Sequence, residues 1–170
     1  MILPDILENE LVVLKVLQET DFDELYAIAS NPLIWEQHPA KNRYEKDVFE
    51  LFFREAIKSD LSFKVIDKSN NQIIGSTRYY NYNQNNSSVA IGYTFLDRKY
   101  WGGKFNKSMK DLLINYAFQF VENVYFHVGA NNIRSQMALS NIGAKKLGII
   151  SQENNGINVI SLEYLIKRKN

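Results

Sequence analysis

The sequence predicts a single α/β domain over residues 1–170, built on a mixed β-sheet. Three observations support this prediction. Strand and helix patterns follow one another in the order β-α-α-β-β-β-α-β-α-β-β, which excludes an all-α or an all-β domain. The β-α-β unit inside that order requires a parallel pair of strands, because its helix returns the chain to the starting end of the sheet. A length of 170 residues suits one domain with its own hydrophobic core.

The N-terminal third is predicted to hold one strand and two helices. Residues Glu10–Leu17 form a nearly continuous apolar run, which is typical of a strand. Thr20 is the expected N-cap of the first helix, with Asp23 three residues later in the spacing of a capping box. The second helix is expected at Tyr44–Ser59, because large apolar residues repeat there at helical spacing.

The rest of the chain alternates more regularly. Three consecutive strand patterns separated by polar turns predict an antiparallel meander over Leu61–Asp67, Gln72–Tyr80 and Val89–Leu96. The elements predicted after the meander are a helix at Lys104–Val121, a strand at Val124–Val128, a helix at Ile133–Asn141 followed by the helix-ending Gly143, and strands at Lys145–Ser151 and Ile157–Ile166. Asn154-Asn155-Gly156 is the hairpin turn expected between the last two strands.

The most informative segment is the turn between the third meander strand and the long helix. Residues Asp97–Gly103 end in two glycines immediately before the helix. Free backbone N–H groups and the positive end of the helix dipole meet there, and both favour a phosphate group. The same region carries four cations, Arg98, Lys99, Lys104 and Lys107. The pattern predicts a site for a phosphorylated cofactor, and it is neither a P-loop nor a G-x-G-x-x-G dinucleotide motif.

Composition excludes several other classes of function. The formal net charge is +1, so the field of the whole protein favours neither nucleic acid nor a membrane surface. The absence of cysteine rules out disulfides, thiolate metal sites and a cysteine nucleophile, and we expect no metal. No apolar run approaches the roughly 18 residues of a membrane span, and the first ten residues do not resemble a signal peptide. We therefore expect a cytoplasmic protein.

Three segments carry a more specific signal: IIGSTRYYNY, then IGYTFLDRKYWGGKFN, then NNIRSQMALSNIGAKKLG. In this order they resemble motifs of the GNAT superfamily of acyl-CoA-dependent N-acetyltransferases, above all its ribosomal-protein N-terminal acetyltransferase branch. The segments span Ile73–Gly148, and the element order extends the resemblance to nearly the whole chain. The resemblance implies a GNAT fold, with acetyl-CoA as co-substrate.

The resemblance also implies which residues bind acetyl-CoA. The pantetheine arm would pair like an added strand with the main chain of Tyr93, Thr94, Phe95 and Leu96. The pyrophosphate would accept hydrogen bonds from the main-chain N–H groups of Gly102, Gly103, Lys104, Phe105 and Asn106. Asn132 matches the family asparagine that reaches the pantetheine, and Ser135 matches the serine beside it and is also a candidate for a catalytic role.

The chain departs from the family pattern at four positions. Lys104 replaces the central glycine of the loop, and Ser108 replaces a glutamate that often ends it. Ala90 stands where many members carry an acidic general-base candidate, and Leu139 stands where others carry a tyrosine that acts as general acid. We therefore expect a base that acts through water, or one supplied by a substrate loop.

Two further residues are catalytic candidates on the acceptor side. His38 lies in the loop between the first two helices and titrates near neutrality, which suits an acceptor contact or a proton relay, although it is otherwise an ordinary loop histidine. Arg78 binds a carboxylate or phosphate of the acceptor, or it forms a surface salt bridge. His127 either faces the cleft or is a satisfied histidine of the sheet.

The expected function is acetyl transfer from acetyl-CoA to a primary amine by direct attack of the amine. The acceptor is a peptide or a small molecule, and the protein is a monomer or a homodimer without nucleic-acid or membrane partners. Two alternatives remain open: a GNAT-fold module that binds acyl-CoA without turnover, and an unrelated nucleotide-binding domain that shares the glycine turn.

Overall fold

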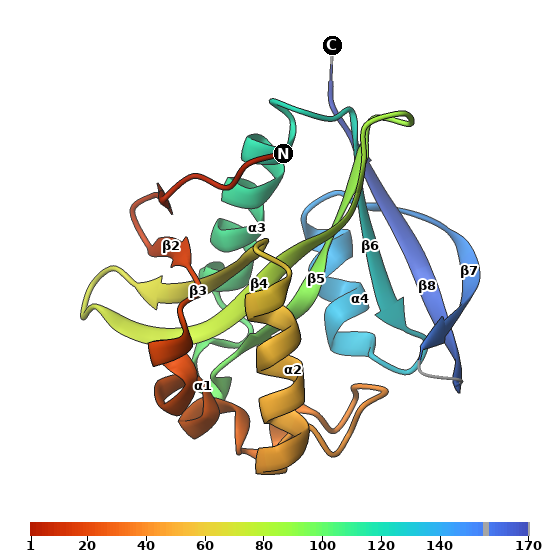
Figure 1. Cartoon of the computed structure of the whole chain (residues 1–170). Coiled ribbons are helices and arrows are strands. Elements are labelled where there is room, and N and C mark those ends of the chain that lie inside the picture. Colours follow the sequence, from red (N-terminus) through yellow and green to blue (C-terminus); the bar gives the residue numbers. More distant parts are fainter. Residues whose placement is uncertain (155–156, 170) are drawn as a thin grey trace.

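One mixed sheet organises the chain (Figure 1). The computed structural model describes residues 1–154 and 157–169, and within them eight strands are ordered β1-β2-β3-β4-β5-β6-β8-β7. The strands are β1 (Ile6–Glu8), β2 (Val12–Val16), β3 (Ser62–Asp67), β4 (Gln72–Asn83), β5 (Ser88–Leu96), β6 (Asn123–Gly129), β7 (Lys145–Asn154) and β8 (Ile157–Lys167). The helices are α1 (Phe22–Ala29), α2 (Lys46–Lys58), α3 (Lys104–Ala117) and α4 (Ile133–Asn141), with 3-10 turns η1 (Glu19–Asp21), η2 (Pro32–Ile34) and η3 (Arg98–Tyr100).

The strand pairing confirms the predicted α/β class and mixed sheet. Strands β1 to β5 pair with their sequence neighbours in antiparallel fashion, so the predicted meander is confirmed. Strand β5 pairs with β6 in parallel across the helix α3, as the central β-α-β unit requires. Strand β8 then lies between β6 and β7, antiparallel to both.

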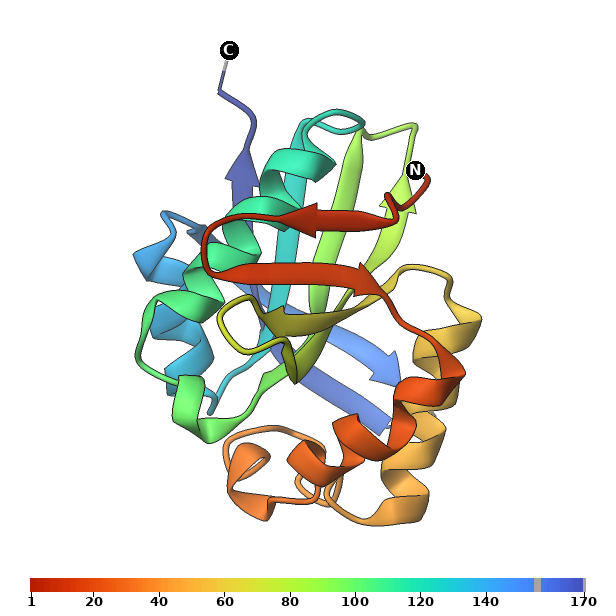
Figure 2. The same ribbon diagram turned by 90° about the vertical axis from the view of Figure 1, so that its left-hand side faces the viewer.

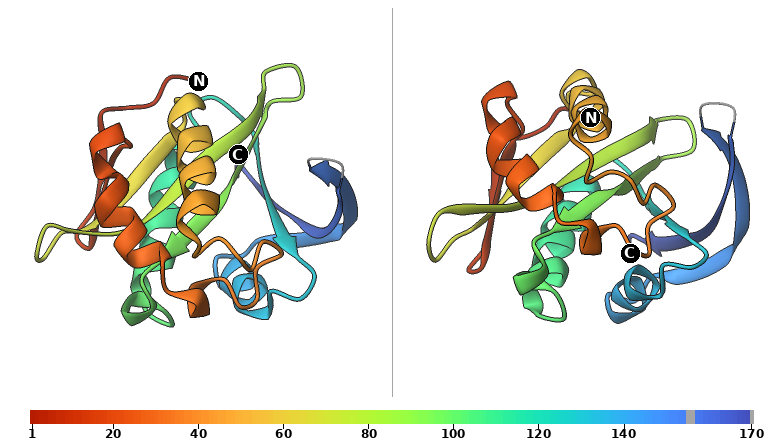
Figure 3. Two further views of the ribbon diagram at one scale, coloured as in Figure 1. Left: turned by 60° about the horizontal axis from the view of Figure 1, so that its bottom comes forward. Right: turned by 90° about the horizontal axis from the view of Figure 1, so that it is seen from below.

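Helices cover both faces of the sheet (Figure 2 and Figure 3). Helices α1 and α2 lie on one face and α3 and α4 on the other. The core under α3 includes Met109 and Phe126, both essentially inaccessible to solvent. The core under α1 and α2 includes Phe49 and Phe95. No helix of the described chain is long and apolar enough to cross a membrane.

The N-terminal elements differ from the prediction in two details. Strand β1 was not predicted, because three residues at a sheet edge give no apolar periodicity. The predicted capping box of Thr20 and Asp23 is wrong. The main-chain N–H of Gln18 instead donates to the carboxylate of Asp21 at 2.8 Å, and the 3-10 turn η1 precedes α1. Asp21 also pairs with Lys64 of β3 at 2.6 Å, which fixes this turn to the sheet.

The other boundaries shift by a few residues. Helix α3 ends at Ala117 and not at Val121, because the N–H groups of Gln119 and Phe120 bond to carbonyls three residues earlier, in a tighter turn than an α-helix. Helix α4 has the predicted bounds, and Gly143 adopts a φ of +80° after its end, as a helix-ending glycine does. The predicted hairpin turn at 154–156 falls on residues 155–156, outside the described residues.

The parallel pair at the centre of the sheet is short, and this creates the site. Strands β5 and β6 pair only through Ser88–Asn123, Val89–Val124 and Ala90–Tyr125. Beyond these pairs the strands diverge, so the unpaired ends of β5 and β6 border a gap in the sheet. The loop after β5 and the N-termini of α3 and α4 lie at this end of the sheet (Figure 1).

Candidate active site

A cleft of about 550 Å³ opens where β5 and β6 diverge. Its walls are the ends of these strands, the loop before α3, the first turns of α3 and α4, and the segment after α1. The candidate residues that line it are His38, Tyr93, Thr94, Phe95, Leu96, Gly102, Gly103, Asn106, Asn132 and Ser135. Lys104, Phe105 and Arg78 are not among the lining residues.

A β-bulge shapes the β5 wall of the cleft. Ser76 pairs with Phe95 and Arg78 pairs with Gly92, so two residues of β5 lie opposite one residue of β4. Tyr93 in this bulge has a φ of +52°, an uncommon conformation for a residue with a side chain. A bulge leaves its extra residue outside the regular hydrogen-bond ladder. The bulged segment therefore offers main-chain polar groups to a ligand that enters the cleft.

The loop after β5 presents a helix N-terminus to the same cleft. Gly102 has a φ of +69°, whereas Lys104 is the first residue of α3 and has no positive φ. The change of the family glycine to Lys104 therefore causes no backbone strain, because Gly102 takes the left-handed conformation. Gly103 is the N-cap and has no side chain to cap the helix, which leaves the first N–H groups of α3 without a side-chain acceptor.

Aromatic side chains fix this loop in place. The indole N–H of Trp101 donates to the carbonyl of Leu96 at 3.0 Å, and the hydroxyl of Tyr100 donates to Asp67 at 3.0 Å. Phe105 packs edge-on against Tyr100, with ring centroids 4.7 Å apart. The side chain of Phe105 is thus structural, and only its main-chain N–H is left for the predicted phosphate contact.

The opposite wall is the N-terminus of α4. Asn132 is buried, and its side-chain oxygen accepts the N–H of Ser135 at 3.1 Å, which makes Asn132 the N-cap of this helix. The cap leaves the amide NH2 of Asn132 for a ligand.

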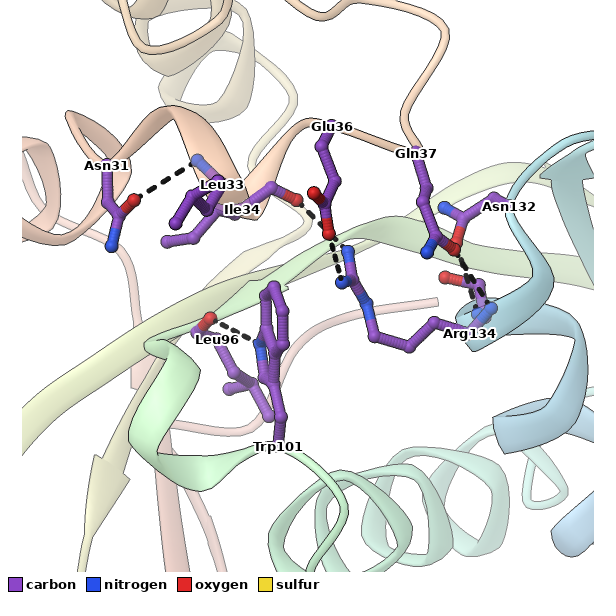
Figure 4. A network of polar contacts seen from close by, with 10 residues as sticks. Asn31, Leu33, Ile34, Glu36, Gln37, Leu96, Trp101, Asn132 and Arg134 are labelled. Atoms are coloured by element: carbon purple, nitrogen blue, oxygen red, sulfur yellow. Dashed lines mark hydrogen bonds and ion pairs between the residues drawn. The ribbon is translucent and has the colours of Figure 1, made fainter.

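Arg134 links three walls of the cleft, and the sequence analysis missed it (Figure 4). Its guanidinium lies 3.6 Å from the ring centroid of Trp101 and donates to the carbonyl of Ile34 at 3.2 Å. It also pairs with Glu36 at 3.6 Å, and its main-chain N–H donates to Gln37 at 3.2 Å. These contacts join α4 to the loop before α3 and to the loop after α1, and no local sequence pattern indicates them.

His38 lies on the acceptor-side wall in a setting that keeps it neutral. Burial and, to a smaller extent, the charge of Arg43 lower the pKa of His38 to about 3. Its Nδ1 accepts the N–H of Ala40 at 2.9 Å, and its Nε2 lies 3.4 Å from Nη1 of Arg43, a group that can only donate. This geometry does not favour the predicted proton relay, because both ring nitrogens of His38 already face a donor.

Arg78 is buried on the α2 face of the sheet, which excludes the alternative of a surface salt bridge. Its guanidinium stacks on Tyr93, 3.7 Å from the ring centroid, and donates to the carbonyl of Glu55 at 3.0 Å. Its Nε is buried and has no hydrogen-bond partner among the described residues. Arg43 stacks on Phe52 nearby at 4.4 Å, so two guanidinium groups share this aromatic wall.

His127 both faces the cleft and is satisfied within the sheet, which combines the two interpretations of the sequence. Its Nδ1 is 2.7 Å from the hydroxyl of Tyr80, and its Nε2 is 3.3 Å from the carboxylate of Glu163. Tyr80 and Glu163 lie on β4 and β8, far from His127 in the sequence. Only the three-dimensional arrangement brings the three together.

Lys110 is a second functional candidate that the sequence analysis missed. It is 7% exposed, lines the cleft, and holds its ammonium 5.1 Å from the ring centroid of Phe126. Burial lowers the pKa of Lys110 to about 8. Asn106, one turn earlier on α3, has a buried side-chain oxygen without a partner among the described residues. A signal was present, because Asn106, Lys110, Leu113 and Ala117 fall on one helical face.

The described residues contain no group of three or more acidic, histidine or cysteine side chains that would hold a metal ion. The polar groups that line the cleft include main-chain amides, side-chain amides and cations, besides hydroxyl and imidazole groups. Such groups suit a ligand with phosphates and amide bonds.

The chain is similar to known proteins in sequence and in fold. A family model described as an acetyltransferase (GNAT) domain matches residues 12–145. No curated protein matches in sequence. A solved GCN5-related N-acetyltransferase from Brucella melitensis superposes with a TM-score of 0.82 at 22% identity, over 96% of this chain and 80% of that chain. A GNAT-family acetyltransferase from Bacillus anthracis superposes with a TM-score of 0.78 at 14% identity, over 95% of this chain and 98% of that chain.

A third structure, Mycobacterium smegmatis RimJ in complex with CoA-disulfide, superposes with a TM-score of 0.70 at 16% identity, over 92% of this chain and 81% of that chain. At these identities the structural likeness shows a shared fold.

Proposed function

This chain belongs to the GNAT acetyltransferase family and is an acyltransferase, and we propose that it transfers the acetyl group of acetyl-CoA to a primary amine of a peptide N-terminus or a small molecule. The proposal treats residues 1–170 as one catalytic domain. The observation that carries it is the cleft between β5 and β6, which joins a bulged strand to the uncapped N-terminus of α3.

The proposed cofactor site uses main-chain groups for most of its contacts. Pantetheine would lie along Tyr93–Leu96, where the bulge interrupts the pairing with β4. The pyrophosphate would accept hydrogen bonds from the N–H groups at Gly102–Asn106, where the helix dipole also favours negative charge. Two side-chain amides support the pantetheine placement: the buried oxygen of Asn106 could accept from a pantetheine N–H and has no partner among the described residues, and the cap of α4 leaves the NH2 of Asn132 to donate.

The amine would approach from the α1 and α2 face of the sheet. His38 and Arg78 are the proposed acceptor contacts there, and Ser135 lies across the cleft on α4. Arg43 and Arg78 make this face cationic, and neither forms an ion pair with a carboxylate of the described residues. A polycationic acceptor would be repelled, whereas a carboxylate or phosphate of the acceptor would satisfy the unpartnered Nε of Arg78.

Direct attack requires placement of the thioester, polarisation of its carbonyl and removal of protons from the amine. A covalent intermediate is not required, which agrees with a chain that has no cysteine. Binding energy from the long cofactor would hold the thioester at the gap between the strands while the amine enters from the other face.

The direct test is detection of free CoA thiol when the purified protein is mixed with acetyl-CoA and single members of an amine library. We expect thiol release with a subset of primary amines, and with acceptors that carry a carboxylate or phosphate more than with polyamines. Acetyl-CoA binding without thiol release from any amine would support the alternative of a non-catalytic binding module and contradict the proposal.

A further inference from the structure

Three side chains form a hydrogen-bonded row across the sheet at the point where β5 and β6 part. The hydroxyl of Tyr80 on β4 is 2.7 Å from Nδ1 of His127 on β6. Nε2 of His127 is 3.3 Å from the carboxylate of Glu163, its direct partner on β8. A carboxylate only accepts hydrogen bonds, so Nε2 carries the ring proton. Nδ1 of the neutral ring is then an acceptor, and Tyr80 donates to it.

The row crosses β5 at a glycine. Tyr80 lies opposite Ala90 of β5, and its ring passes over Gly92 to reach His127. A Cβ on Gly92 would lie 2.8 Å from the Tyr80 ring. The last parallel pair of β5 and β6 is Ala90 with Tyr125, so the Tyr80 ring crosses β5 directly after this pair. Both Gly92 and His127 line the cleft.

The surroundings suit a group that takes up a proton temporarily. Burial raises the pKa of the Tyr80 hydroxyl, as do the nearby Tyr93 and Glu163, while Arg78 lowers it. Tyr80 therefore stays protonated at neutral pH and has a proton to pass on. Glu163 would stabilise the imidazolium that His127 becomes, as the orienting carboxylate of a catalytic histidine does.

We propose that Tyr80, His127 and Glu163 form the general base that removes a proton from the acceptor amine; this inference rests on the proposed acetyl transfer. The amine ammonium gives one proton to the Tyr80 oxygen while Tyr80 passes its own proton to Nδ1 of His127. The amine nitrogen then bonds to the thioester carbonyl carbon, and the carbon–sulfur bond breaks. The second nitrogen proton goes to solvent, the sulfur leaves as a thiolate that then takes up a proton, and His127 releases its proton to water.

The test compares three variants with the parent. Tyr80→Phe should lower kcat at least about tenfold, and His127→Gln should lower it about 100-fold, both within the range of general-base catalysis. Glu163→Gln should lower kcat less and shift the acidic limb of the pH profile to lower pH, because His127 acts as a base only in its neutral form. The Kd for acetyl-CoA should not change, and Tyr82→Phe, a hydroxyl deletion on the same strand, should keep full activity. A kcat within twofold of the parent in folded His127→Gln overturns the relay.

A second readout separates the relay from the reaction itself. The chain has only two histidines, so nitrogen NMR of labelled protein resolves each ring. We expect His127 as the Nε2–H tautomer at neutral pH, with a change at Nδ1 in Tyr80→Phe. The Nδ1–H tautomer would overturn the relay even if the enzyme acetylates amines. An absence of thiol release from the parent with every amine would instead overturn the proposed function.

A separate observation on the other face of the same strand concerns Lys110. Phe126 precedes His127, and successive strand residues point to opposite faces, so the ammonium over Phe126 lies on the α3 side of the gap. Lys107, its neighbour on α3, pairs with Asp111 at 2.6 Å, whereas Lys110 has no ion-pair partner among the described residues. Leu139 lines the same cleft and has no proton to give.

We infer that the Lys110 ammonium stabilises the CoA thiolate as it leaves and supplies its proton when the second amine proton has gone to solvent. The nitrogen–hydrogen bond of the ammonium breaks as the sulfur–hydrogen bond forms, and water reprotonates Lys110. A cation beside a thiol favours its thiolate form, so bound CoA itself reports the contact.

The test needs no acceptor amine. Ultraviolet absorbance of the thiolate, measured against pH on the CoA complex, gives the pKa of the bound thiol. We expect the pKa of the bound thiol to lie below that of free CoA in the parent and in Lys110→Arg. In Lys110→Met, whose side chain has a volume similar to that of lysine but no charge, this pKa should return to the value of free CoA. An equal thiol pKa in the parent and Lys110→Met would overturn the assignment. Desulfo-CoA provides the baseline and should bind both proteins equally.

Discussion

The two faces of the central gap are built in different ways. The proposed cofactor side consists mainly of one contiguous segment, β5, its loop and the start of α3, which offers mostly main-chain N–H and C=O groups. The acceptor side consists of side chains from β4, β6, β8 and the loop after α1. A main-chain site tolerates many side chains but depends on backbone conformation. A side-chain site depends on residues whose spacing in the sequence carries no pattern.

Gly102→Pro is expected to have the largest effect, and only on the cofactor side. Proline fixes φ near −65°, whereas Gly102 has a φ of +69°, and it removes an N–H of the proposed phosphate site. Loss of about two charge-assisted hydrogen bonds would weaken acetyl-CoA binding by at least about 100-fold in calorimetry. Gly102→Ala keeps the N–H, and its strained left-handed backbone should lower the free energy of unfolding by roughly 1–2 kcal/mol. Parent-like affinity in folded Gly102→Pro would contradict the loop assignment.

Gly92→Ala is expected to damage only the acceptor side. Its Cβ would meet the Tyr80 ring and displace the hydroxyl from His127. We expect kcat to fall about tenfold or more while the acetyl-CoA affinity stays constant. In a Tyr80→Phe background the same substitution should add little, because the two changes remove one interaction. If the two substitutions lower kcat by independent, additive amounts, Gly92→Ala does not act by displacing Tyr80.

Asn132→Ala should affect both binding and stability moderately. The alanine removes the α4 cap and the proposed amide contact to the cofactor, so acetyl-CoA affinity should fall by roughly 1–2 kcal/mol. Asn132→Asp is the matched control, because its carboxylate still caps the helix but has no NH2. If the ligand contact exists, affinity falls in both variants while the melting temperature falls only in the alanine variant. Unchanged affinity in both would place Asn132 outside the cofactor site.

His38 should give the protein a small pH-dependent loss of stability. Its pKa is about 3 when folded and near 6.5 when unfolded, so the unfolded chain binds the extra proton between these values. The contribution of neutral His38 is complete above pH 6.5 and is lost as the pH falls, with a slope of up to about 1.4 kcal/mol per pH unit. Urea unfolding between pH 7 and pH 5 should show a smaller slope in His38→Gln. Equal slopes would mean that His38 is solvated.

The parts of the fold that the sequence predicted are those with local signals. The apolar stripe located α2, Gly143 marked the end of α4, and the two glycines located the turn before α3, each within a few residues of the bounds in the structure. Strand β1 was not predictable, because three residues are too few to show an alternating apolar pattern and the strand is defined only by its pairing with β2. The capping box was placed at Thr20, two positions too late, because the ion pair of Asp21 with Lys64 is a tertiary contact.

The candidate site likewise contains residues that local sequence patterns identify and residues that only the fold brings together. Gly102 and Gly103 were identifiable because the backbone chemistry of a helix N-terminus is local. The partners of His127 were not, since Tyr80 is 47 residues earlier and Glu163 is 36 residues later in the chain. Lys110 was identifiable in principle, as a cation on the buried face of a predicted helix. The resemblance to the family pointed to Ala90 and Leu139 as lost catalytic positions, but it gave no sign of what replaces them.

The most direct test of the account is calorimetric titration of the parent protein with acetyl-CoA, and separately with ATP. The account predicts saturable, micromolar binding of acetyl-CoA and no binding of ATP, because the cleft would hold the pantetheine arm along β5 as well as phosphates at α3. Binding of ATP as tight as that of acetyl-CoA would show a general phosphate site, and a lack of acetyl-CoA binding would contradict the proposed function outright.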